Sequence, residues 1–70
     1  MGEIKCRLGI LLLERDMKLK DLAEAVGLAD TNLSLLKTGK VKAIRFSTLI
    51  AICNALGCQP GDLLVYEAAK

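Results

Sequence analysis

The sequence contains no histidine and no tryptophan, and Phe46 and Tyr66 are its only aromatic residues. Without histidine, the chain cannot form the Ser-His or Cys-His pairs that activate a nucleophile, nor a metal site built on imidazole. Paired carboxylates and metal-ligand spacings are also missing from the pattern. These absences argue against an enzyme, and we expect no metal, cofactor or small-molecule ligand.

A length of 70 residues excludes a Rossmann unit or a barrel of ordinary size. Hydrophobic residues nevertheless make up 53% of the chain, and with so few aromatics the core must consist of Leu, Ile, Val and Ala. Leu and Ala favour helices, and β-branched residues are in the minority. The composition therefore predicts one all-α domain over residues 1–70.

The chain has three cysteines and lacks a long apolar run. The three cysteines cannot all pair within one monomer, and Cys53 and Cys58 stand five residues apart, which is not a CxxC spacing. We interpret them as small buried thiols in a reducing compartment, with a redox or metal role as the less favoured alternative. No signal peptide is recognisable, and the longest charge-free run, 46–61, contains polar residues, Gly and Pro. We therefore expect a cytoplasmic protein without membrane contact.

Acidic residues are absent between Asp30 and Asp62, and this is where the charge pattern becomes informative. The formal net charge is only +2. Four cations, Lys37, Lys40, Lys42 and Arg45, fall within nine residues of this segment and give it +4, so the rest of the chain sums to −2. This asymmetry indicates a basic edge that faces an anionic partner, with a solvated loop as the alternative.

Apolar spacing and turn residues predict five short helices. The first covers about 4–15, with Ile4, Leu8, Leu11 and Leu12 on one stripe. The second covers about 19–26 and the third about 30–38, the latter capped by Asp30 or Thr31. Ser47 is expected to cap a fourth helix that ends at Gly57, and Pro60 to begin a fifth, preceded by Gln59 as a possible cap.

The segment from residue 19 to residue 37 reads LKDLAEAVGLADTNLSLLK and carries three residues at fixed offsets. Ala23 is small where two helices would cross, Gly27 can adopt positive φ in the tight turn, and Leu33 points inward from the next helix. This pattern predicts a helix-turn-helix over about 19–38. Its packing is rigid enough to project the third helix of the chain into a DNA major groove.

With its flanking helices and the segment KTGKVKAIRFSTLIAICNALGCQPGDLL, this stretch resembles the Cro/C1-type (XRE) family. The resemblance covers about 4–66. It implies a five-helix, lambda-repressor-like DNA-binding domain with double-stranded DNA as its partner. It also implies a small transcriptional regulator, with repression by a homodimer on a two-fold operator as the favoured mode.

The resemblance also implies roles for individual residues. The exposed face of the third helix would meet base edges through Asp30, Thr31, Asn32 and Leu35, and an Asn side chain suits adenine. Phosphate contacts would come from Ser34, Lys37, Thr38, Lys40, Lys42 and Arg45. The alternative for Thr31 and Asn32 is that both are solvated polar residues without a DNA role.

Candidate dimer contacts are Ile50, Leu63, Val65 and Tyr66, with core packing as an equal alternative. Leu19 departs from the family pattern, because many relatives have a polar, phosphate-contacting residue there. The rival function is a protein-interaction module on the same fold, antitoxin-like or antirepressor-like. The basic segment discriminates between the two, because DNA binding requires it and a protein-interaction module does not.

Overall fold

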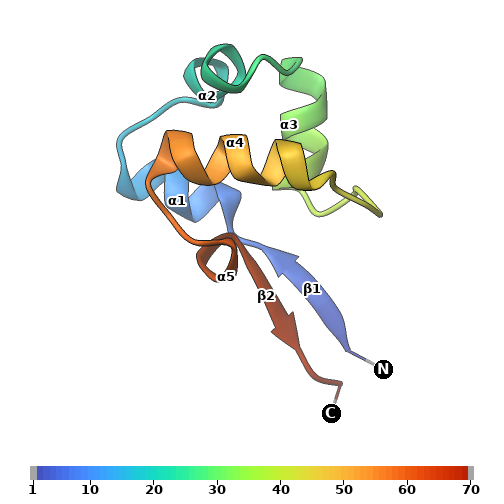
Figure 1. Ribbon diagram of the computed structural model, residues 1–70. Helices are drawn as coiled ribbons and strands as arrows, with labels where there is room; N and C mark the ends of the chain where they lie inside the picture. Colours follow the sequence, from blue (N-terminus) through green and yellow to red (C-terminus); the bar gives the residue numbers. More distant parts are fainter. Residues whose placement is uncertain (1, 70) are drawn as a thin grey trace.

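The computed structural model describes residues 2–69, which form five helices and two short strands. In chain order these are β1 (Glu3–Cys6), α1 (Leu8–Glu14), α2 (Leu19–Val26), α3 (Asp30–Lys37), α4 (Phe46–Leu56), α5 (Pro60–Leu63) and β2 (Leu64–Glu67). The helices form a compact body from which the two strands project, with both chain ends at their tip (Figure 1). None of the helices within residues 2–69 combines the length and the apolar character needed to cross a bilayer.

The two strands correct the prediction of an all-α domain. β1 pairs antiparallel with β2, and in this register Ile4 lies opposite Tyr66. The first helix accordingly begins at Leu8, and Ile4 is 60% exposed on the strand pair rather than buried on a helical stripe. Cross-strand pairs of this kind stabilise a sheet only once both ends of the chain have met, so local periodicity does not reveal them.

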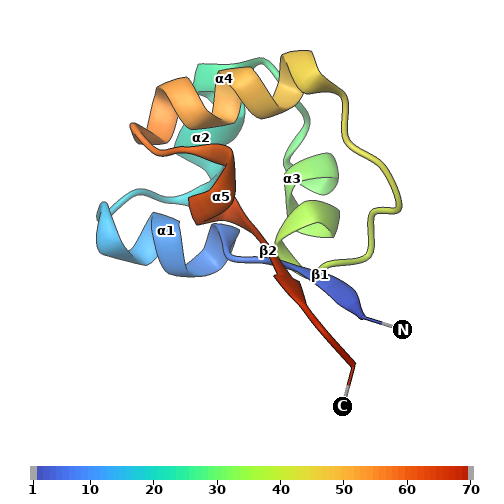
Figure 2. The same cartoon turned by 60° about the horizontal axis from the view of Figure 1, so that its bottom comes forward.

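The core is an aliphatic cluster to which every helix contributes. α1 supplies three buried leucines, and the other helices supply one or two residues each. The buried hydrophobic residues are Leu8, Leu11, Leu12, Leu22, Ala23, Leu33, Leu36, Ile52, Leu56, Cys58 and Leu63. Each fully buried Leu or Ile contributes about 1.5–3 kcal/mol relative to an exposed one. α3 packs against α2 and α1, and α2 also packs against α4. Figure 2 shows α1, α3 and α4 arranged around α5.

The turn between α2 and α3 has the geometry that the sequence predicts. Gly27 adopts a left-handed conformation with φ 73° and ψ 30°. The amides of Gly27 and Leu28 both donate to the carbonyl of Ala23, over 2.9 and 3.1 Å. This left-handed glycine cap, with two amides on one carbonyl, satisfies the end of α2 and turns the chain into α3. Ala23 and Leu33 are both buried where the helices meet.

The starts of two helices differ from the expected caps. α3 begins at Asp30 after an extended Ala29, so Asp30 lies in the first turn instead of capping it, where its charge complements the helix dipole. α4 begins at Phe46 after an extended Arg45, so Ser47 does not cap it either. Gln59 does precede α5, and its backbone N–H donates to the Asp62 carboxylate over 2.9 Å.

Gly27→Ala is expected to lower the free energy of unfolding by about 1–2 kcal/mol, because Ala resists the left-handed conformation. A Cβ at Gly27 would meet no atom within 4 Å, so backbone strain alone is tested. Gly61→Ala is the matched control: its Cβ also meets nothing within 4 Å, and Gly61 lies in α5 without positive φ. Urea unfolding followed by circular dichroism measures both, and equal effects would contradict the account of the turn.

Candidate nucleic-acid interface

α3 presents one side to the core and the other to solvent. Leu33 and Leu36 are buried and attach the helix to the body of the protein. The residues predicted to contact bases are all exposed, namely Asp30, Thr31, Asn32 and Leu35. A short helix anchored by large apolar residues keeps its outer side chains in a fixed arrangement, which reading of base edges requires.

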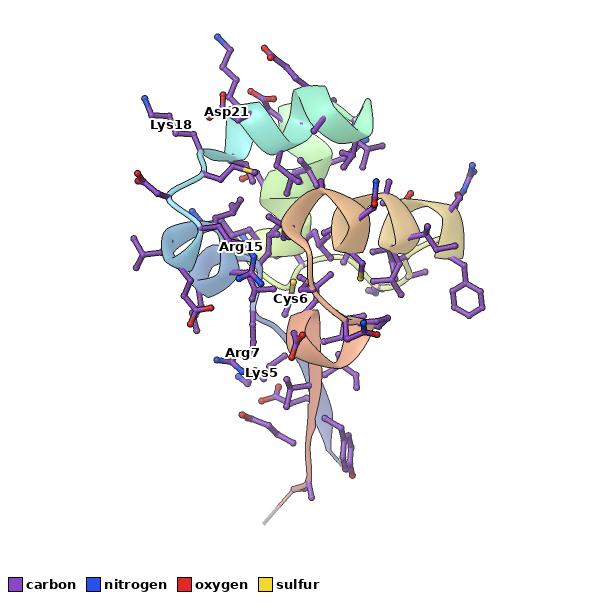
Figure 3. The ribbon with its side chains drawn as sticks, turned by 60° about the vertical axis from the view of Figure 1, so that its left-hand side comes forward. Lys5, Cys6, Arg7, Arg15, Lys18 and Asp21 are labelled. Carbon is purple, nitrogen blue, oxygen red and sulfur yellow. The ribbon has the colours of Figure 1, made fainter. Side chains whose placement is uncertain are left out.

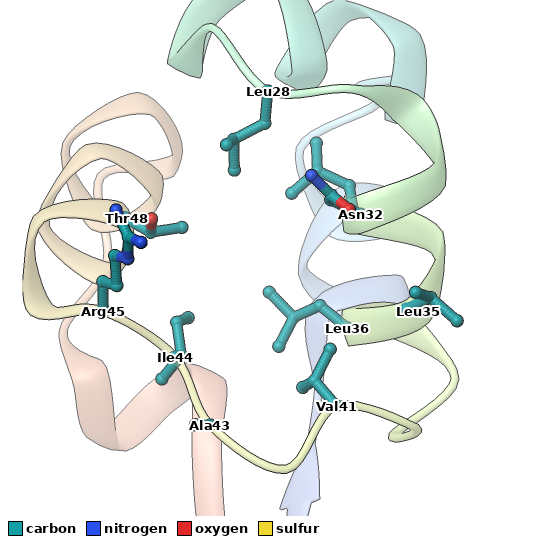
Figure 4. A pocket seen from close by; sticks show the side chains of 10 residues that line it. Leu28, Asn32, Leu35, Leu36, Val41, Ala43, Ile44, Arg45 and Thr48 are labelled. Atoms are coloured by element: carbon teal, nitrogen blue, oxygen red, sulfur yellow. The ribbon is translucent and has the colours of Figure 1, made fainter.

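A groove of about 420 Å³ runs between α3, the following loop and the first turn of α4. Asn32 enters it from α3, and Arg45 and Thr48 lie across from it at the start of α4 (Figure 4). Leu28 and Ile44 line its apolar part. The fold thus brings a predicted base-contact residue and a predicted phosphate-contact residue, thirteen positions apart in the sequence, to one groove.

The first turn of α4 adds backbone donors to this side of the molecule. Arg45 precedes the helix and makes no side-chain capping bond, and the first turn contains no acidic residue. The first amides of a helix lack intrahelical acceptors, and the helix dipole makes this end attractive to an anion. The sequence prediction, with Ser47 as the cap, places the start of α4 two residues too late and does not name Thr48.

The other predicted phosphate-contact lysines are spread over neighbouring surfaces. The Lys40 amide donates to the carbonyl of Leu35 over 2.9 Å, which holds Lys40 against the end of α3. The Lys37 stem packs over Gly9 of α1, where a Cβ would lie 3.2 Å from the Lys37 Cε. Lys42 lines a different groove, of about 240 Å³, beside the strands. Of these four cations, Arg45 lines the groove that Asn32 enters, and Lys40 is bonded through its backbone to the last turn of α3.

The two hydroxyl side chains predicted to contact phosphate, those of Ser34 and Thr38, differ in their hydrogen bonds. The Thr38 Oγ1 donates to the carbonyls of Ser34 and Leu35, over 3.0 and 3.2 Å, and so completes the last turn of α3. A phosphate oxygen can only accept hydrogen bonds, so Thr38 would have to leave these carbonyls to contact one. Ser34 has an exposed side chain on α3.

The cations of the basic segment, residues 37–45, form no salt bridge with a described carboxylate. The salt bridges among residues 2–69 join Lys5 to Glu3 over 2.9 Å and Arg15 to Glu14 over 3.5 Å. In this part of the chain, no ion pair ties a carboxylate to the cations between 37 and 45. All four of those cations are exposed, so their positive potential is directed to the solvent.

The predicted dimer contacts need one correction. Leu63 is completely buried in the core and offers no surface to a partner. Ile50 on α4 and Tyr66 on β2 are 67% and 64% exposed, and Val65 is half-buried. Leu19 is half-buried and packs against the core, which accounts for an apolar residue where a polar one was expected.

Comparisons with known proteins agree with this geometry. The family model of the Cro/C1-type HTH DNA-binding domain matches residues 7–69. The uncharacterized HTH-type transcriptional regulator YozG of Bacillus subtilis (strain 168) is 56% identical over 59 residues, which cover 84% of this chain and 70% of YozG. The crystal structure of the transcriptional regulator VanUg superposes with a TM-score of 0.76 at 33% identity, covering 97% of this chain and 89% of that one. This chain therefore belongs to the Cro/C1-type helix-turn-helix family of DNA-binding transcriptional regulators.

Proposed function

We propose that this protein is a sequence-specific DNA-binding repressor without enzymatic activity, and that residues 1–70 act as one unit with the helix-turn-helix over about 19–38. The observation that carries the proposal is the shared groove, in which Asn32 of α3 lies across from Arg45 and the start of α4. A base-reading residue and a phosphate anchor on one surface are what docking in a major groove requires. Since its partner is DNA, we propose the cytoplasm as its compartment.

In this proposal α3 enters the major groove and its exposed side chains read the bases. The Asn32 amide donates to adenine N7 and accepts from adenine N6, the Asp30 carboxylate accepts from a cytosine amine, and Leu35 touches a thymine methyl. Thr31 can donate or accept. The exposed side of α3 carries no Arg, the side chain that most often reads guanine.

The phosphate backbone would be held at the edge of α3 and at the start of α4. Arg45 can bind a phosphate with two parallel hydrogen bonds, and Lys40 adds a point charge at the end of α3. The uncapped amides of α4 add donors that need no side chain. Lys42, Lys37, Ser34 and Thr38 would contribute from the periphery.

Lys40→Ala combined with Arg45→Ala should weaken binding to every DNA sequence and reduce the slope of log K against log salt by about two. Fluorescence anisotropy with a labelled duplex at several salt concentrations measures this slope. The matched control is Lys5→Ala combined with Arg7→Ala, which removes the same charge from the side of the strands (Figure 3).

The control pair should leave the slope unchanged. Equal slopes for all three proteins would exclude Lys40 and Arg45 from the phosphate contacts. If the unchanged protein bound no duplex at any salt concentration, the protein-interaction module would be favoured, and exposed apolar residues such as Phe46 and Leu13 would then mark its surface.

Asn32→Ala should relax base preference at one operator position, costing roughly 1–3 kcal/mol of discrimination between the preferred base and the others. Competition binding with single-base variants of a bound site provides the measurement. Asn54→Ala is the control, because Asn54 is exposed on α4 and lines another groove. A discrimination profile that Asn32→Ala leaves intact would remove this residue from base recognition.

We propose further that two copies bind together, each α3 in one of two half-sites about 34–36 Å apart, and repress by occupying the operator. Ile50 and Tyr66 supply exposed apolar area for such a contact. Either Ile50→Glu or Tyr66→Glu should raise the dimer dissociation constant, as measured by sedimentation, because a buried unpaired carboxylate is costly. Glu24→Gln on α2 is the surface control; a wild-type protein that sediments as a monomer at high concentration and on DNA would contradict the dimer.

A further inference from the structure

The end of α4 repeats the turn that ends α2. Gly57 is left-handed, with φ 62° and ψ 43°, and the amides of Gly57 and Cys58 both donate to the carbonyl of Cys53, the latter over 3.0 Å. In this arrangement the side chain on the accepting residue meets the side chain that follows the glycine. At the end of α2 those two positions hold Ala23 and Leu28, but at the end of α4 both hold thiols.

The two thiols share one environment. Cys53 is half-buried, Cys58 is 9% exposed, and both line a groove of about 630 Å³ together with Phe46, Ile50 and Pro60. Burial raises the pKa of the Cys58 thiol, and the charge and hydrogen bond of the neighbouring Cys53 raise it further. The two thiols thus lie on one groove that is open to solvent.

We propose that Cys53 and Cys58 form a dithiol site that is reversibly oxidised to a disulfide by a low-molecular-weight disulfide. A disulfide needs α-carbons within about 7 Å of each other and converging β-carbons. A backbone bond of 3.0 Å between the two residues keeps their α-carbons within that limit. Both side chains line the same groove, as converging β-carbons require.

The reaction is a two-step exchange. The Cys53 thiolate attacks one sulfur of the disulfide R–S–S–R, forms a mixed disulfide and releases one thiolate RS⁻. Cys58 then loses its proton and attacks the Cys53 sulfur, which releases the second RS⁻. The protons of the two cysteines pass to the two RS⁻ groups, so the protein loses two electrons and the small disulfide gains them.

Burial and the groups around Cys58 determine how readily it loses its proton for the second step. The Arg15 guanidinium donates to the Leu56 carbonyl at the end of α4, and its charge acts to lower the pKa of Cys58. Burial, Cys53 and Asp62 act in the opposite direction, and their sum raises this pKa. Exchange should therefore be slow at neutral pH and faster in mildly alkaline solution, because the thiolate is the attacking species.

Cys6 lies apart from the dithiol, and the dithiol alone does not make a metal site. Cys6 ends β1 and lines the groove beside Lys42, not the groove of the dithiol. Among residues 2–69, no group of three or more His, Cys, Asp or Glu is placed to hold a metal ion, so the dithiol has no further ligand for a four-coordinate site. Oxidation of the pair is the chemistry that the two thiols can complete alone.

The experiment uses the reduced 70-residue chain and glutathione disulfide at mildly alkaline pH. Free thiols are alkylated, the protein is then reduced, and newly released thiols receive an isotopically heavy reagent. The expected result is a monomer lighter by two hydrogen atoms, heavy label on Cys53 and Cys58, light label on Cys6, and full recovery with dithiothreitol. Cys6→Ser, which keeps the pair, should give the same bond.

Cys53→Ser and Cys58→Ser should each form only a mixed disulfide with glutathione, and circular dichroism of both variants checks that they fold. Three light-labelled cysteines in the wild-type protein would overturn the proposal. So would a stable mixed disulfide on wild-type Cys53, a bond to Cys6, or a bond between two chains.

Discussion

The arrangement of this protein depends on one backbone constraint, the left-handed glycine turn in which the Gly27 and Leu28 amides share the carbonyl of Ala23. The turn satisfies the end of α2 and fixes the direction in which α3 leaves it. Ala23 allows the two helices to approach closely, and Leu33 locks α3 onto the core. The orientation of α3, and with it every proposed base contact, follows from this local geometry.

The proposed DNA-binding surface lies at the groove between this oriented helix and the start of α4. Asn32 reaches the groove from one side, and Arg45 lies on the other (Figure 4). Arg45 is paired with no carboxylate of the described residues, and α4 contributes uncapped amides beside it. Charge, donors and shape therefore coincide on one side of the protein. The mild net charge of +2 conceals this concentration.

The sequence predicts the parts of the structure that depend on local order. The three- and four-residue spacing of leucines identifies the buried faces of α2 and α3, and glycine marks where they end. It fails where distant segments meet. The pairing of Ile4 with Tyr66 joins the two ends of the chain, and Leu63 is buried because α5 packs on the core rather than at a partner surface. The proximity of Cys53 and Cys58 could be predicted only in part. Their five-residue spacing is visible in the sequence, but the turn geometry at Gly57 comes from the structure.

For the site, the sequence identifies the residue types but not their grouping. The cluster of cations is visible in the chain, yet Lys37 leans over Gly9 and Lys42 lines another groove, while Arg45 lies across from Asn32. The direction of a long side chain depends on the neighbours it packs on, and these come from other helices.

The most direct test of the central claim, that α3 reads DNA from a fixed orientation, is selection of bound duplexes from a random DNA library. The account predicts enrichment of two inverted half-sites whose centres lie about one helical turn apart, 34–36 Å, with an adenine in each half-site for Asn32. Recovery of unenriched sequences after repeated selection would contradict it.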